Sequence, residues 1–172
     1  MKNRQIRTRR VAFFGLAASL ALLLSYVEFL LPPLFVAVPG IKVGLPNIVI
    51  LYVLYSMGWR DAVLVSLVRI CLSSLLFGNM MTLAYSLAGA LLSLAMMGLL
   101  KKTDLLTTVG VSVAGGVSHN LGQIAVAMLL LNTPQIAFYM IVLSVTGTIA
   151  GIVIGLCGAI LIKRLPCKKM FH

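Results

Sequence analysis

The chain has few of the residues that a soluble enzyme needs. Only three of its 172 residues are acidic, and charged residues together make up 10% of the sequence. A soluble domain of this size needs many more charges to keep its surface wetted. Because 61% of the residues are hydrophobic, the composition predicts an integral membrane protein with one compact helical domain.

The acidic residues are too few and too far apart for most metal-assisted chemistry. Glu28, Asp61 and Asp104 are isolated from one another, so the paired aspartate-rich motifs that hold magnesium and diphosphate are missing. The sequence also lacks the G-x-x-x-x-G-K-[ST] phosphate loop. We therefore expect no catalytic residues, and any use of ATP would depend on other subunits.

Cysteine and histidine are equally scarce. The three cysteines form no C-x-x-C pair, since Cys71 and Cys157 lie in apolar runs and Cys167 in a basic tail. This spacing excludes a disulfide framework. His119 has no second histidine, cysteine or carboxylate at ligand spacing, and the other histidine is the terminal His172. We expect no metal site and no cofactor.

Long apolar runs separated by turn-forming residues dominate the sequence. Because the connections are short, successive helices should be antiparallel neighbours. The prediction is an all-α polytopic membrane protein, a six-transmembrane-helix bundle over residues 11–162 with basic cytoplasmic tails at 1–10 and 163–172. The expected helices cover residues 11–31, 43–58, 61–77, 82–100, 107–131 and 136–162.

The basic residues predict the orientation. The formal net charge is +11, and basic residues concentrate at alternate helix ends. Cytoplasmic loops carry an excess of Lys and Arg, so both termini should lie in the cytoplasm. The membrane that the helices cross should be the plasma membrane. Only Lys42 would lie outside, and Arg69 lies within a helix. The cytoplasmic set would be Lys2, Arg4, Arg7, Arg9, Arg10, Arg60, Lys101, Lys102, Lys163, Arg164, Lys168 and Lys169. This pattern explains the charge without a nucleic-acid partner.

Polar side chains inside the fifth apolar run carry most of the functional information. His119, Asn120 and Gln123 lie where water is not available to them, so each needs a partner. His119 and Gln123 are four residues apart and share a helix face, with Asn120 beside them. The arrangement fits a ligand pocket, and it also fits a packed junction with interhelical hydrogen bonds. Both interpretations remain open.

Arg69 lies near the middle of the third apolar run. A buried arginine in a membrane should face protein or a water-filled cavity. It would serve either as the counter-charge of an anionic ligand group or as a structural arginine bonded to carbonyls or an acid. Together with Lys42 and Asn47 near the outer end of the second helix, it predicts an outer-half site for an anionic or neutral ligand.

Small residues recur at helical spacing in two of the predicted helices. Gly147, Gly151 and Gly155 lie four residues apart and predict a groove in which another helix packs closely. Ala17 and Ala21 form a weaker version on the first helix.

Several segments resemble one known family over nearly the whole chain. They are PGIKVGLPNI (39–48), Arg69 with SLLFG (74–78), YSLAGALLS (85–93) and VSHNLGQ (117–123). In these segments the chain is similar to the Gx transporter family, also labelled heptaprenyl diphosphate synthase component I. That family in turn resembles the substrate-binding (S) components of energy-coupling factor transporters.

The resemblance implies a membrane subunit that binds a small molecule and works with a transmembrane T component and two ATPase subunits. Ala17 and Ala21 would contact the T component. A stand-alone transporter and a membrane-bound accessory component of isoprenoid or quinone biosynthesis are the alternatives. The residues that would bind substrate are Lys42, Asn47, Arg69, His119, Asn120 and Gln123.

Overall fold

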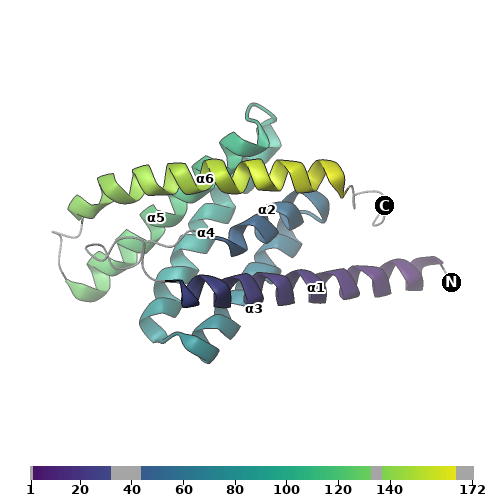
Figure 1. Cartoon of the computed structure of the whole chain (residues 1–172), viewed down its shortest axis with the longest axis horizontal. Coiled ribbons are helices and arrows are strands. Elements are labelled where there is room, and N and C mark those ends of the chain that lie inside the picture. The colour runs from purple at the N-terminus through teal and green to yellow at the C-terminus, as the bar shows by residue number, and fades with distance from the viewer. Residues whose placement is uncertain (1, 32–43, 133–136, 166–172) are drawn as a thin grey trace.

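A computed structural model of the protein describes residues 2–31, 44–132 and 137–165, and these residues form six helices (Figure 1). The expected all-α fold is confirmed. The basic segment before residue 11 continues the first helix, although we expected only a tail there. The helices are α1 Lys2–Leu30, α2 Pro46–Ser56, α3 Trp59–Phe77, α4 Met80–Thr103, α5 Thr108–Leu131 and α6 Tyr139–Arg164.

The helices differ in their capacity to cross a bilayer. Among the described residues, four segments are long and apolar enough: Arg7–Leu30, Met80–Thr103, Thr108–Leu131 and Tyr139–Arg164. The α3 helix carries three charged residues, and α2 has only 11 residues. At 1.5 Å per residue α2 is roughly 16 Å long, about half of the hydrocarbon thickness. The chain is a helical membrane protein, and its six crossings stay a prediction.

Local side-chain chemistry fixes the helix boundaries where the sequence predicted breaks. At the α3–α4 turn the Asn79 side chain accepts a hydrogen bond of 2.9 Å from the Thr82 backbone N–H, and Thr82 Oγ1 accepts one of 2.8 Å from the Asn79 N–H. This reciprocal capping box starts α4. Asp104 and Asn132 end α4 and α5 in the left-handed conformation, which these two residue types tolerate.

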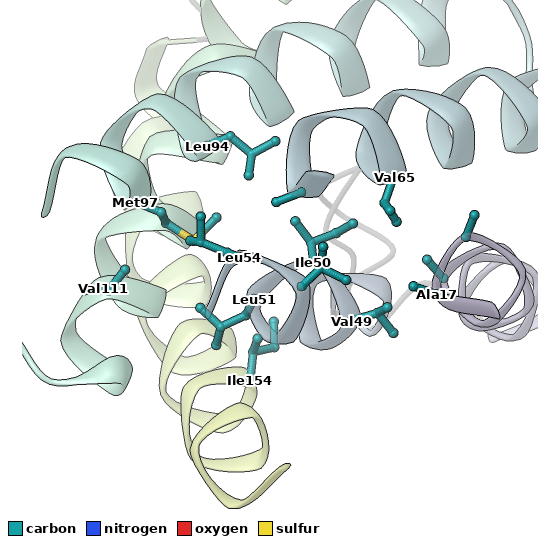
Figure 2. Close-up of a cluster of buried hydrophobic side chains, with 14 residues drawn as sticks. Ala17, Val49, Ile50, Leu51, Leu54, Val65, Leu94, Met97, Val111 and Ile154 are labelled. Carbon is teal, nitrogen blue, oxygen red and sulfur yellow. The ribbon is translucent and has the colours of Figure 1, made fainter. Parts of the chain in front are cut away.

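The short helix α2 lies at the centre of the hydrophobic core. Its side chains from Val49 to Leu54 are all buried. Figure 2 shows that residues of the other five helices surround it. These neighbours include Ala17 of α1, Val65 of α3, Leu94 and Met97 of α4, Val111 of α5 and Ile154 of α6.

The α5 and α6 helices approach each other so closely that their backbones touch. A Cβ atom at Gly151 would lie 2.6 Å from Val113 Cα, and one at Gly155 would lie 2.7 Å from Val109 Cα. At Gly147 the added atom would meet the Asn120 side chain at 2.6 Å. The small-residue groove predicted on the last helix therefore receives α5.

The expected partner-contact patch on α1 requires a correction. Ala17 and Ala21 are 5% and 0% exposed and belong to the core around α2. Their small side chains let α1 approach its own neighbours closely, so they are not available to another subunit in this conformation. The outward face of α1 instead presents larger side chains, among them Leu16, Leu20 and Leu23.

Polar contacts hold together the end of the bundle at which α1 begins and α6 finishes (Figure 1). Arg10 Nη2 lies 2.5 Å from Asp61 Oδ2 at the start of α3. The Tyr52 hydroxyl donates a hydrogen bond of 2.8 Å to the carbonyl oxygen of Leu165. We refer to this end, which also carries Lys101 and Lys102, as the basic end.

Candidate functional site

A cavity of about 400 Å³ lies between the helices, and all six of them contribute residues to its wall. Glu28 of α1, Asn47 of α2 and Phe77 of α3 belong to helix ends remote from the basic end. Leu143 and Thr146 come from the first turns of α6, at the same end. Part of the cavity wall therefore lies at the end of the bundle remote from the basic residues.

Polar side chains make up more than half of the lining, in a body that is otherwise apolar. Hydroxyl and amide groups are costly to bury without hydrogen-bond partners. Their accumulation in the cavity wall therefore indicates that water or a ligand occupies the cavity. The polar lining residues are Ser25, Glu28, Asn47, Arg69, Ser73, Ser74, Asn79, Thr82, Ser86, Ser93, Ser112, His119, Asn120, Gln123 and Thr146.

The structure brings together five of the six residues that the sequence indicated for substrate binding. Asn47 on α2, Arg69 on α3 and three residues on α5, His119, Asn120 and Gln123, all line this cavity. Lys42, the sixth, lies outside the described residues. That these side chains bind a substrate stays a prediction.

Arg69 stands out by its unused hydrogen-bonding capacity. Its Nε atom is buried and has no hydrogen-bond partner within the described part of the chain. Glu28 is the one acidic residue among the described lining residues, and its Oε1 accepts a hydrogen bond from the backbone N–H of Gly44. A buried donor without an acceptor is unfavourable, and an acceptor group on a ligand would relieve that cost.

The polar residues of α5 divide between packing and the cavity. The Asn120 side chain donates a hydrogen bond to the carbonyl oxygen of Leu143 and so joins α5 to α6. His119 and Gln123 pack beside Gly89 of α4, where a Cβ atom would lie 2.9 Å from His119 Cε1 and 3.0 Å from Gln123 Cγ. The packing interpretation is clearest for Asn120, and ligand binding by His119 and Gln123 stays a prediction.

Sequence reasoning missed most of the hydroxyl groups in the lining. Ser73 follows Arg69 by four residues, which places it on the same side of α3. Ser86 and Ser93 are seven apart on α4 and share a face in the same way. The spacing of Ser73 from Arg69, and of Ser86 from Ser93, was the signal that could have revealed these hydroxyl groups.

The fold and the cavity define a helical membrane protein with a polar internal cavity. The sequence pattern of the family described as heptaprenyl diphosphate synthase component I matches residues 17–161. The chain belongs to this family, as its motifs indicated. The match includes every described residue of the cavity wall. No curated protein and no solved structure matches the chain.

Proposed function

We propose that the protein is the substrate-binding subunit, similar to an S component, of an energy-coupling factor type uptake transporter. Its substrate would be a small, anionic or neutral organic molecule. The observation that carries the proposal is the polar cavity of about 400 Å³ that all six helices line, with Arg69 Nε in its wall lacking a hydrogen-bond partner among the described residues. Pockets of this size suit small organic molecules.

The distribution of charge supports an outward-facing site. Under the positive-inside rule, the basic end with both termini lies in the cytoplasm. Part of the cavity wall, including Glu28, Asn47 and Phe77, belongs to the opposite helix ends, so the substrate would enter from outside. In this arrangement all six helices cross or enter the plasma membrane, with α2 buried among the others.

The transport partners are those that the resemblance to S components implies, a transmembrane T component and two ATPase subunits. They would supply the driving force, since this chain has no phosphate loop for ATP. The T component would contact a surface other than Ala17 and Ala21, because both are buried in the core.

Mass spectrometry of the purified protein tests the binding role. We expect a small molecule to co-purify with the wild type and to be lost from Arg69→Gln. Arg60→Gln removes an exposed arginine from the same helix outside the cavity, so it should retain the molecule. Equal retention by both variants would remove Arg69 from the site.

Affinity purification from native membranes tests the transport role. The T component and both ATPases should be recovered with the tagged chain. If the chain is recovered alone and still drives full uptake in vesicles, the partner assignment is wrong.

The family description favours a second candidate, a membrane component of prenyl diphosphate synthesis. With isolated acidic residues, this chain would anchor or regulate a soluble synthase and leave the chemistry to that partner. A change in the rate of a soluble prenyl diphosphate synthase on addition of this protein would favour the second candidate over transport.

A further inference from the structure

A second hollow lies beside the polar cavity, between α1 and α3. It is a groove of about 470 Å³ with mainly apolar walls, lined by Ser19, Leu22, Leu23, Tyr26, Leu76 and Phe77. Leu23 and Tyr26 are 58% and 48% exposed, so the groove is open to the outside of the bundle. In a membrane, that outside is the lipid phase.

Phe77 is the one residue, among those described, that lines both the groove and the polar cavity. Its ring centroid lies 5.1 Å from that of Phe29, which faces the cavity, and 5.8 Å from that of Tyr26, which faces the groove. Aromatic side chains therefore form the boundary between the two spaces. Side chains can rotate, whereas a backbone wall between the spaces could not open without moving a helix.

The two spaces have complementary chemistry. The cavity offers hydroxyl and amide groups and the guanidinium of Arg69, which suit a polar, negatively charged group. The groove offers leucine and aromatic surface, which suits a hydrocarbon chain. A wholly polar ligand would use the cavity and leave the groove to lipid.

We propose that the ligand is an amphiphile, with an anionic head group bound at Arg69 and an apolar tail that passes Phe77 into the groove between α1 and α3. The inference rests on the proposed binding function and specifies its substrate class. A carboxylate or a phosphate would satisfy the guanidinium in the same way, and the test separates these two heads.

Photolabelling of the full-length protein in lipid nanodiscs tests the proposal. The probes are decyl phosphate and decanoic acid, each with a diazirine at the chain end, and decanol with the same diazirine as the uncharged control. We expect at least one anionic probe to label Leu22, Leu23 or Leu76, and excess butyl phosphate or butyrate to compete with it. Decanol should label lipid-facing residues, and excess butyl phosphate or butyrate should not reduce this labelling.

Two pairs of variants separate head-group from tail binding. Arg69→Gln should lower groove labelling by an anionic probe about tenfold or more, as expected for a hydrogen bond to a charged group, while Arg60→Gln should not. Phe77→Trp should narrow the passage and reduce groove labelling by an anionic probe. Phe138→Trp alters an exposed aromatic side chain outside both spaces and should change neither result.

Several outcomes would overturn the inference. Uncompeted labelling of all lipid-facing helices, unchanged in Arg69→Gln, would mean that the groove holds only bulk lipid. Arg69-dependent binding of butyl phosphate or butyrate, without tail labelling of the groove, would leave the proposed function intact and reject the amphiphile. Retention of a wholly polar co-purified molecule would have the same consequence.

Discussion

The ammonium group of Lys101 donates a hydrogen bond of 2.6 Å to the carbonyl oxygen of Leu54 and lies 4.8 Å from the ring centroid of Tyr55. Leu54 lies in the last turn of α2, where carbonyl groups lack partners within the helix. A cation at this position also interacts favourably with the negative end of the helix dipole. One side chain of α4 thus anchors the central helix of the core.

Removal of this ammonium group should destabilise the protein. We expect Lys101→Met to lower the free energy of unfolding by about 1.5–3 kcal/mol, the range for a hydrogen bond to a charged group. Lys102→Met is the matched control, because Lys102 is adjacent in sequence and exposed. Thermal unfolding in detergent would compare them, and equal melting temperatures would contradict the anchoring role.

The glycine contact between α5 and α6 gives a second stability prediction. Gly151→Ala should destabilise by about 1–3 kcal/mol, because its Cβ would lie 2.6 Å from Val113 Cα and force the backbones apart. Gly15→Ala is the control, since no heavy atom would lie within 4 Å of its Cβ. In the middle of α1 this control should stabilise by up to about 1 kcal/mol. The same unfolding assay measures both variants, and a stable Gly151→Ala would argue against the close packing.

The positions of the helices could be predicted from the sequence, but which face of each helix points to the core could not. Residues that cap helices through local contacts, such as Asn79 at the start of α4 and Asp104 at its end, allowed the breaks to be predicted. In a membrane, both the lipid-facing and the core-facing sides of a helix are apolar. Hydrophobic periodicity therefore does not distinguish the two sides. Ala17 and Ala21 were therefore expected on the outside, and they lie in the core.

Only part of the cavity lining could be predicted from the sequence. Arg69 and His119 are unusual in an apolar run and attract notice singly. A serine is unremarkable there, because its hydroxyl can bond to a carbonyl of its own helix, as Ser25 Oγ does to Ala21 at 2.9 Å. Only the packing of the six helices shows that Ser73, Ser86 and their neighbours face one space.

Asn120 and Gln123 should respond differently to truncation. Asn120→Ala removes the hydrogen bond to Leu143 and should lower stability by about 0.5–1.5 kcal/mol. Gln123→Ala should mainly lower ligand affinity, because its side chain lines the cavity. Unfolding and ligand retention, measured on both variants, would test the division. Identical profiles would show that the two residues act as one unit.

The single tryptophan provides an intrinsic probe of α3–α4 packing. Its indole N–H donates a hydrogen bond of 3.0 Å to the carbonyl oxygen of Leu94, and a Cβ at Gly98 would lie 2.5 Å from Trp59 Cδ1. Gly98→Ala should displace the indole from α4 and shift its fluorescence emission to longer wavelength. Gly15→Ala should leave the spectrum unchanged, and an unchanged spectrum in Gly98→Ala would place the indole elsewhere.

The ion pair between Arg10 and Asp61 should contribute little energy despite its short distance. The Arg10 side chain is 53% exposed, so water and salt screen the attraction, and we expect a coupling energy of about 1 kcal/mol or less. A double-mutant cycle with Arg10→Gln and Asp61→Asn measures it. The coupling should fall further at high ionic strength. A salt-independent value of several kcal/mol would indicate a pair shielded from solvent.

The glycine contacts also determine which part of the protein can change shape. At Gly122 of α5 a Cβ would lie 2.7 Å from the Ala88 carbonyl oxygen of α4, and at Gly116 one would lie 2.6 Å from the Gly147 carbonyl oxygen of α6. Contacts between backbones cannot adjust by rotation of side chains, so α4, α5 and α6 should move as one rigid body. The α1 and α3 helices border the cavity with large rotatable rings, Phe29 and Phe77. Under the proposed function, adaptation to ligands of different sizes would therefore be confined to that side.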